Sequence, residues 1–206
     1  MKRYLYNALL MMCLAMIFAG CSTAPKTAAD RDKLHADVLA TVERFKTEDP
    51  SMKTFFDDAS GWAVFPSVTM GGAGIGGAHG RGELYEGGTM TGHCDLSQAT
   101  IGFQLGGQVY SEIIFFQNDD ALARFRTGNF AFSAQASAVA ATAGVSVDAD
   151  YDKGVAVFTM AKGGLMFEAS VGGQKFRFEP WRPPGVGAEA ARQAPGHVQG
   201  KAQPDE

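Results

Sequence analysis

The sequence IGFQLGGQVYSEIIF, residues 101–115, alternates between two kinds of side chain. Its mostly apolar positions are Ile101, Phe103, Leu105, Gly107, Val109, Ser111, Ile113 and Phe115. Its mostly polar or small positions are Gly102, Gln104, Gly106, Gln108, Tyr110, Glu112 and Ile114. A period of two over so many residues predicts a long strand with one buried face. The Gly106-Gly107 pair in its middle predicts a bend or bulge.

Strand signals continue on both sides of this segment. Upstream, residues 61–66 (GWAVFP) predict a strand that the proline closes, and residues 69–82 form a glycine-laden stretch. Gly87-Gly88 then separates two short apolar-polar runs, which predicts a hairpin over residues 83–94. Downstream, we expect further strands at 130–147, 154–161, 165–171 and 175–178, the last with Phe176 and Phe178 facing inward.

The segment before the first strand has helical spacing. Residues 30–48 carry one apolar stripe, which consists of Leu34, Val38, Val42 and Phe45. We expect Asp30 to be the N-cap of this helix, and Pro50 to end it. Residues 51–59 predict a further helical turn or two, with Phe55 and Phe56 facing inward.

A second, shorter helix is predicted directly after the central strand. Residues 118–120 (NDD) have the side chains of a helix cap. We expect this helix to bury Leu122 and Phe125 and to end at Gly128.

Together these elements predict one α+β domain over residues 30–181. We expect a mainly antiparallel, strongly curved sheet or a partly closed β-barrel, with an amphipathic N-terminal helix and one short internal helix. The chain contains 26 glycines, and small residues let strands curve and backbones approach closely. Residues 21–29 form a tether, and residues 182–206 form a tail that has little to bury and that we expect to be disordered.

Residues 1–20 have the pattern of a secretory signal. Lys2 and Arg3 precede an uncharged run at 4–18, and Ala19-Gly20-Cys21 follows. This ending resembles the bacterial lipobox, which implies cleavage before Cys21 and acylation of its thiol. Ordinary secretion and a retained anchor are the alternatives, although the run is shorter than the ~20 residues of a membrane span. Ser22 stands where an Asp would indicate inner-membrane retention, so we expect the periplasmic face of the outer membrane.

Charge and cysteine content limit the function classes. Removing the signal takes away Lys2 and Arg3 but none of the 22 acidic residues, so the net charge changes from −4 to −6. An acidic chain argues against general nucleic-acid binding, and it requires any lipid binding to be local. Once Cys13 has left with the signal and Cys21 is acylated, Cys94 has no partner for an internal disulfide.

Four segments, in the same order along the chain, resemble the SYLF domain family. They are ASGWAVFP at 59–66 with the spaced glycines that follow (Gly71-Gly72 and Gly76-Gly77), GFQLGGQ at 102–108 with the apolar strand 113–116, DALARF at 120–125, and KGGLMFEASVGG at 162–173. The resemblance covers roughly residues 30–178. It implies a lipid-binding protein: eukaryotic members bind phosphoinositides, some bind actin, and bacterial members are often lipoproteins.

The sequence contains partial motifs for nucleotide and metal binding, but neither motif is complete. Gly72–Gly77 satisfies Gly-x-Gly-x-x-Gly, but the AHGRG that follows cannot begin the helix that a dinucleotide site requires. His93, Cys94 and Asp95 are possible metal ligands, yet in a strand only His93 and Asp95 share a face, and we expect a half-buried thiol at Cys94. We find no catalytic constellation, and we expect no cofactor and no metal.

The same resemblance implies that a basic N-terminal helix engages the membrane. Arg31, Lys33, Arg44 and Lys46 on the helix at 30–48 are therefore the first candidates for phosphate contacts. The secondary candidates are Lys53, Arg81 and Lys162. The alternative is that the apolar stripe of the helix packs on the sheet, where four such side chains contribute about 6–12 kcal/mol.

Three hypotheses follow. The first is a non-enzymatic, phospholipid-binding lipoprotein of the bacterial envelope, anchored through Cys21. The second is an envelope scaffold that binds a protein partner without lipid headgroup specificity. The third is an enzyme that acts on an envelope substrate, which would require a pocket with convergent ionisable groups.

Overall fold

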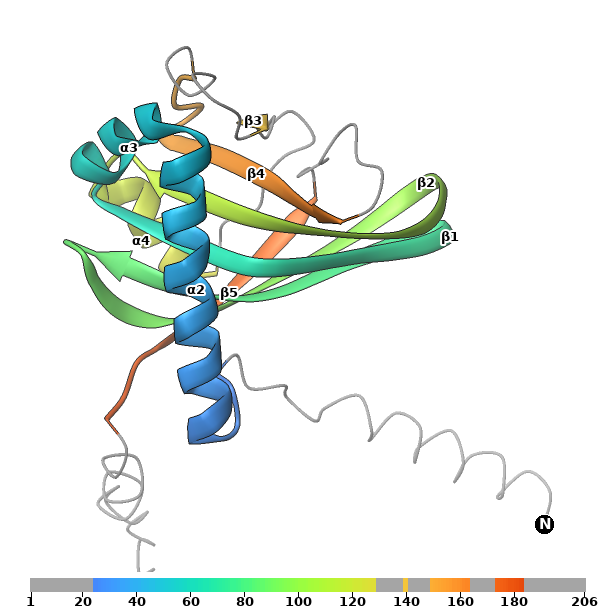
Figure 1. Ribbon diagram of the computed structural model, residues 1–206, viewed down its shortest axis with the longest axis horizontal. Coiled ribbons are helices and arrows are strands. Elements are labelled where there is room, and N and C mark those ends of the chain that lie inside the picture. The colour runs from blue at the N-terminus through green and yellow to red at the C-terminus, as the bar shows by residue number, and fades with distance from the viewer. Residues whose placement is uncertain (1–23, 129–138, 141–148, 164–172, 184–206) are drawn as a thin grey trace, which may run out of the picture.

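The computed structural model describes residues 24–128, 139–140, 149–163 and 173–183 (Figure 1). Cys21, the predicted strand at 165–171, most of the predicted strand at 130–147 and the tail from residue 184 lie outside these ranges. The described residues combine helices with a sheet, as the sequence predicts. None of the described helices is both long and apolar enough to span a bilayer.

A two-stranded ribbon forms the centre of the domain. β1 (Gly61–Glu86) and β2 (Thr89–Phe116) pair antiparallel along nearly their whole length. The turn between them consists of Gly87 and Gly88, whose φ angles of 55° and 77° are readily adopted by glycine. The predicted hairpin is therefore confirmed.

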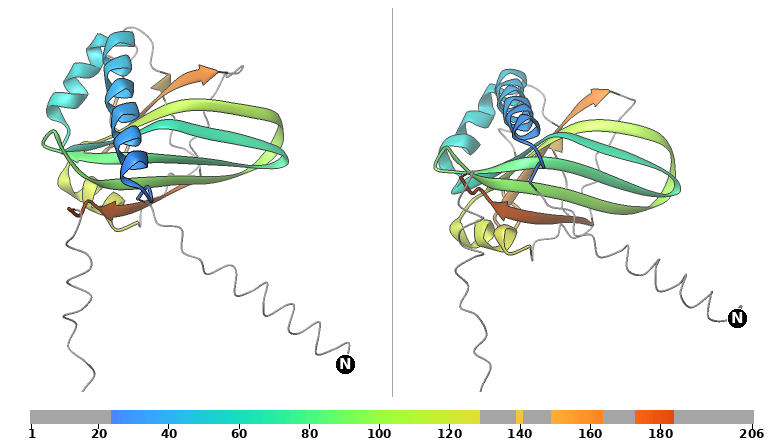
Figure 2. Two further views of the ribbon diagram at one scale, coloured as in Figure 1. Left: turned by 60° about the horizontal axis from the view of Figure 1, so that its bottom comes forward. Right: turned by 90° about the horizontal axis from the view of Figure 1, so that it is seen from below.

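This ribbon folds back on itself, so that its two halves lie over one another (Figures 1 and 2). The pairing register shifts between Ala73 and Ile75, within the glycine-rich part of β1. Gly82 then lies directly over the beginning of the same strand, because a Cβ at this position would be 2.2 Å from the carbonyl oxygen of Val64. The glycine-rich stretch is thus the place where the strand reverses its direction in space.

Two sequence predictions about the ribbon are wrong. Pro66 does not close a strand, because it lies at a register shift between Phe65 and Val68, where the missing amide donor is tolerated. Of the bend or bulge predicted at Gly106-Gly107, the bulge is wrong, because both residues pair regularly with Gly71-Gly72. The ribbon's irregularity lies a few residues earlier in β2, opposite the register shift in β1.

Three further strands extend the ribbon. β4 (Val155–Gly163) pairs antiparallel with the last part of β2, and β5 (Gln174–Pro180) pairs antiparallel with its first part. β3 (Val139–Ala140) pairs parallel with β4. The described strands form an open sheet, and not the partly closed form that the sequence also allowed. The strands predicted at 154–161 and 175–178 are confirmed as β4 and β5.

Helices cover one side of the folded ribbon. α2 (Ala28–Glu48) crosses the strands, and it is followed by the 3-10 turn η2 (Pro50–Met52) and by α3 (Lys53–Asp58). The predicted cap Asp30 is wrong: the N-cap is Thr27, whose hydroxyl accepts a hydrogen bond from the amide of Asp30 at 3.1 Å.

α4 (Asp119–Arg126) is the short helix predicted after the central strand. Its N-cap is Asn118, whose side chain accepts a hydrogen bond from the amide of Ala121. Leu122 and Phe125 are buried, and Gly128 follows with a φ of 70°. The prediction for this helix is confirmed.

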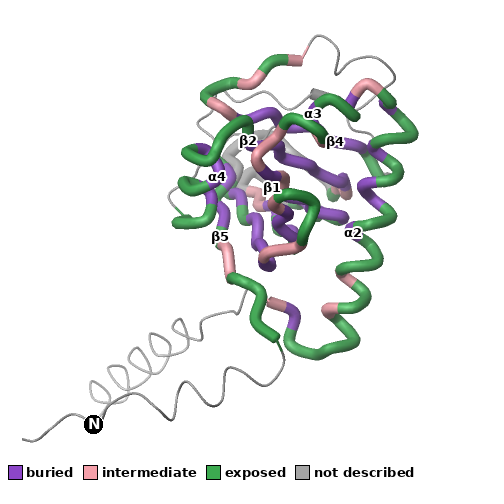
Figure 3. The backbone as a smooth tube through the Cα atoms, turned by 90° about the vertical axis from the view of Figure 1, so that its left-hand side faces the viewer, coloured by how far each residue is buried: buried purple, intermediate pink, exposed green. Residues whose placement is uncertain are grey.

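Two hydrophobic clusters lie on opposite sides of the ribbon's first half. The inner cluster lies between the two halves and includes Phe65, Leu84, Ile114 and Phe116. The outer cluster lies under α2 and α3, and its members from the described helices and strands include Val38, Val42, Phe45, Phe55, Ile113, Phe115 and Phe158. Figure 3 shows the result: the strands are buried, whereas α2 is exposed on the side away from them.

β2 is buried on both faces, and not on one face as the sequence predicts. The apolar positions Ile113 and Phe115 are buried under the helices, as the alternation predicts. The face predicted to be polar is buried as well: Tyr110, Glu112 and Ile114 lie on the inner side of the ribbon and have no exposed surface. The stripe on α2 packs on the sheet, which is the alternative that the sequence left open.

Candidate functional site

A pocket lies where the first turns of α2 cross the outer face of the ribbon's second half. It has a volume of about 520 Å³, which is in the usual range for small-ligand pockets. Its lining comes from α2, from the β1–β2 hairpin and from the chain that follows β5: Ala28, Arg31, Asp32, His35, Glu83, Thr89, Met90, His93, Trp181 and Arg182. We call this the α2 pocket, and Figure 2 shows the start of α2 beside the end of β5.

Glu83 forms the buried wall of the α2 pocket. Its side chain is only 1% exposed, and Oε2 accepts a hydrogen bond from the Tyr85 hydroxyl at 2.8 Å. The same oxygen lies 2.9 Å from Nδ1 of His35 on α2. Burial, and then the neighbouring Glu83 carboxylate, raise the pKa of Tyr85, so its hydroxyl remains a donor. The Tyr85 ring is fixed in turn by stacking on Trp62, with 4.1 Å between ring centroids.

His93 lies opposite Glu83 in the strand pairing, and it is 4% exposed. Neither of its ring nitrogens has a hydrogen-bond partner in the described part of the chain. Burial lowers the pKa of His93, although the carboxylates of Glu83 and Glu179 act in the opposite direction. The neutral ring therefore has one donor and one acceptor that no group in the described residues satisfies.

The neighbours of His93 follow the predicted alternation. Asp95 lies on the same face, where Arg177 donates to it at 3.1 Å. Cys94 points to the inner cluster with no exposed surface, so the predicted half-buried thiol is wrong. Burial raises the pKa of this thiol. The described residues contain no group of three or more His, Cys, Asp or Glu side chains that could hold a metal ion.

The seven predicted phosphate ligands do not form one surface. Three of them are paired with an acid on their own helix: Lys33 with Asp37, Lys46 with Glu43, and Lys53 with Asp57. Two others, Arg44 on α2 and Lys162 on β4, are exposed.

The remaining two predicted ligands lie on the side of the α2 pocket. Arg81 on β1 is 3.9 Å from Asp95. Arg31 lines the pocket, and its guanidinium donates to the carbonyl of Pro25 at 3.1 Å. Arg31 is thus the one predicted residue that the described structure places in this pocket.

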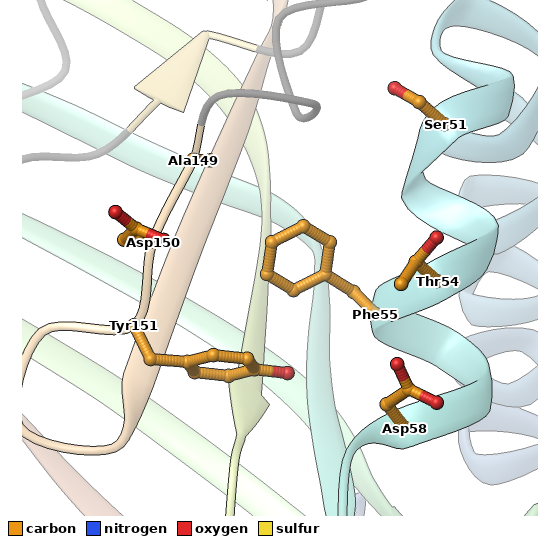
Figure 4. Close-up of a pocket in the computed structure, with 7 residues that line it drawn as sticks. All are labelled: Ser51, Thr54, Phe55, Asp58, Ala149, Asp150 and Tyr151. Atoms are coloured by element: carbon orange, nitrogen blue, oxygen red, sulfur yellow. The ribbon is translucent and has the colours of Figure 1, made fainter.

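A second pocket lies between α3 and residues 149–151 (Figure 4). It has a volume of about 330 Å³ and is lined by Ser51, Thr54, Phe55, Asp58, Ala149, Asp150 and Tyr151. Burial, and then the charge of Asp58, raise the pKa of Tyr151 to about 12. Figure 4 shows the Phe55 ring between the two sides and the Asp150 carboxylate directed away from Asp58, so the acidic groups do not converge.

Comparison with known proteins finds a family that matches part of the chain. Residues 97–180, which run from β2 through α4 and β4 to the end of β5, match the family model described as Las17-binding protein actin regulator (Ysc84), the SYLF domain. This part of the chain is similar to the SYLF family. The resemblance that the sequence motifs indicate is therefore confirmed. The matched residues include β5, which pairs with the part of β2 that contains His93. They do not include α2, Glu83 or His93, so the match does not itself define the α2 pocket.

A curated relative supports the same assignment. The chain is 27% identical over 165 residues to beta cell expansion factor A of Aeromonas veronii. The alignment covers 74% of this chain and 59% of that protein, so the chain matches little more than half of its relative.

Proposed function

We propose that this SYLF protein is a non-enzymatic, phospholipid-binding lipoprotein, held at the periplasmic face of the outer membrane by fatty acyl chains on Cys21. The observation that carries the proposal is the position of Ala24. Its amide donates to Oε2 of Glu179 at 3.2 Å, at the end of β5 beside the α2 pocket. Three residues span at most about 11 Å, so an acylated Cys21 holds this end of the domain close to the bilayer.

The residues at this end suit a membrane interface. Trp181 is 49% exposed, and Arg31 and Arg182 lie beside it on the pocket lining. Tryptophan concentrates at the level of lipid headgroups, and arginine attracts their phosphates. Trp181 is held in place because its amide donates to the carbonyl of Thr91 at 2.9 Å.

The long face of α2 is a weaker candidate for the contact surface. It carries four basic residues, and five acidic residues accompany them: Asp30, Asp32, Asp37, Glu43 and Glu48. Its apolar stripe is already used against the sheet. We therefore propose that lipid is contacted at the pocket end of the helix, with Arg31 as the main contributor among the predicted cations.

The proposal that the protein is not an enzyme is supported by the chemistry of the α2 pocket. His35 and Glu83 could act as a base and its orienting acid, but the lining residues include no serine or cysteine nucleophile beside them. The buried carboxylate, the neutral ring and the arginines are instead groups that bind a polar molecule.

Flotation with vesicles tests the proposal. The acylated protein is expected to float with vesicles of any composition. The mature chain with Cys21→Ser is expected to float more weakly, and to lose several-fold in binding when Arg31, Trp181 and Arg182 are replaced by Ala. Lys33→Ala is the matched control, since Lys33 is exposed and paired with Asp37.

Two results would contradict the proposal. One is an unmodified Cys21 thiol in mass spectra of the native protein, together with its recovery from the free periplasmic fraction. The other is a Cys21→Ser chain that never binds vesicles but co-purifies with one envelope protein, which is the result expected of a scaffold.

A further inference from the structure

We infer that the α2 pocket binds the zwitterionic headgroup of a phospholipid whose arm ends in a primary ammonium, a phosphoethanolamine. The inference rests on the proposed function and names the ligand of the same site. Its starting point is the ring of His93, which is 96% removed from solvent and lines the pocket without any hydrogen-bond partner in the described residues. A buried polar group of this kind costs stability unless a ligand or water satisfies it.

The charges of the lining are balanced. Two carboxylates, Glu83 and Asp32, and two guanidiniums, Arg31 and Arg182, contribute to the pocket. A net anion would be repelled by the carboxylates and a net cation by the guanidiniums. A zwitterion with its two charges separated by a short arm satisfies both pairs.

The position of each group in the chain sets the orientation of the ligand. Arg31 lies near the start of α2 and Arg182 follows the end of β5, which is the end where Ala24 approaches Glu179. The phosphate therefore stays at the membrane side. Glu83 and His93 lie on paired strands at the bottom of the pocket, where Glu83 is almost completely buried. The arm of the headgroup extends toward them.

The bottom of the pocket has acceptors that a hydrogen-bond donor from the ligand would satisfy. Oε2 of Glu83 already receives the Tyr85 hydroxyl and faces His35, and the neutral His93 ring has one acceptor nitrogen. A primary ammonium supplies three donors. A choline group has none and is larger, so it leaves the acceptor nitrogen of His93 unpaired. A glycerol arm donates through hydroxyls but gives the carboxylates no positive charge to bind.

Vesicle binding of the mature chain with Cys21→Ser tests the inference, with phosphatidylethanolamine, phosphatidylglycerol or phosphatidylcholine at the same fraction of each vesicle. We expect the tightest binding to phosphatidylethanolamine. Glu83→Gln and His93→Phe are expected to weaken this binding about tenfold and to remove the headgroup preference. Lys33→Ala is the control that leaves the pocket intact.

A second measurement needs no substitution in the pocket. Nitrogen-15 NMR spectra of the histidine rings are recorded for the Cys21→Ser chain while glycerophosphoethanolamine, which is water-soluble, is added. We expect the two ring nitrogens of His93 to shift, and those of the exposed His79 to stay unchanged. The same shift with free inorganic phosphate alone would show that the ammonium arm is not recognised, and would overturn the inference.

The outcomes separate the inference from the proposed function. Equal binding to all three vesicles, unaffected by Glu83→Gln and His93→Phe, would overturn the headgroup assignment and leave membrane binding standing. Equal binding to phosphatidylglycerol and phosphatidylethanolamine would overturn the claim that the pocket recognises a primary ammonium. A His93 shift with glycerophosphoethanolamine but no vesicle binding would support the pocket chemistry and contradict the membrane function.

Discussion

Two of the buried carboxyl groups of the folded ribbon, Glu83 and Glu112, have opposite surroundings. Glu83 lies on the outer face at the wall of a pocket, with a donor from Tyr85 and with His35 of α2 beside it. Glu112 lies on the inner side, fully buried, where Gln174 donates to its Oε2 at 2.9 Å. Burial raises the pKa of Glu112 to about 8, and the hydrogen bond from Gln174 only partly opposes this.

Burial of a carboxyl group alone does not indicate a ligand site. Glu112 is accommodated in the core as a neutral carboxyl group near neutral pH, because the hydrogen bond from Gln174 compensates only part of the cost of a buried charge. Glu83 has its donors arranged around it and opens toward a cavity shared with the unpartnered ring of His93. The cavity and the ring, and not the burial, carry the argument for binding.

The largest expected effect comes from Glu112→Gln. The folded state keeps the proton of Glu112 between its ordinary pKa of 4.5 and its raised pKa of about 8, whereas the unfolded chain releases it. The free energy of unfolding of the natural protein should therefore fall as pH rises through this window, by roughly 5 kcal/mol in total. The variant should lack this decrease. Urea unfolding at a series of pH values measures it, and parallel curves for both proteins would contradict the neutral Glu112.

Gly82→Ala tests the folded ribbon that separates the two carboxyl groups. Its Cβ would lie 2.2 Å from the Val64 carbonyl oxygen, so one of the two strand segments must move. We expect a loss of about 3 kcal/mol in the free energy of unfolding. Gly107→Ala is the matched control, since its nearest contact would be an ordinary 3.6 Å. Equal stability of the two variants would show that the halves of the ribbon do not approach as described.

Glu83→Ala addresses the outer carboxylate. The change removes the 2.8 Å acceptor of the Tyr85 hydroxyl and leaves it only the 3.3 Å contact with Nδ1 of His35, and we expect a loss of about 2 kcal/mol in unfolding free energy. The double variant with Tyr85→Phe should recover part of this loss, because no unpaired hydroxyl then remains. If the second substitution added its full cost instead, the two groups would not be coupled.

Lys33→Ala should have the smallest effect. Lys33 and Asp37 are both well exposed, and a surface pair of this kind contributes at most about 0.5 kcal/mol. Thermal unfolding of the variant should be nearly unchanged. A clear loss of stability would mean that α2 depends on its surface charges more than on Val38, Val42 and Phe45.

Local features of the fold could be predicted because each depends on residues close in sequence. Gly87-Gly88 specifies a turn, Asn118 caps α4, and the alternation that ends in Ile113 and Phe115 identifies a strand. The reversal of the ribbon could not be predicted, because glycines permit it without specifying its direction. Once the ribbon folds back, the second face of β2 is buried as well, and the prediction that Glu112 lies on a polar face is wrong.

The α2 pocket depends on long-range geometry. A regular two-residue hairpin would not pair Glu83 with His93; the register shift between Leu84 and Tyr85 does. Arg182 belongs to the tail that the sequence predicts at 182–206, although it lines the pocket. Among the lining residues, only Arg31 could be predicted from its charge and its position on the helix. The sequence does not separate Arg31 from Lys33; the structure does, because Lys33 pairs with Asp37.

Tryptophan fluorescence in vesicles tests most directly whether the pocket end of the domain faces the bilayer. The chain has two tryptophans, so Trp62→Phe reports Trp181 alone and Trp181→Phe reports Trp62 alone. We predict that brominated lipids quench Trp181 in the membrane-bound protein and shift its emission to the blue, while Trp62, which is stacked on Tyr85, stays unquenched. Equal quenching of both, or of neither, in protein that is bound to the vesicles would contradict the orientation.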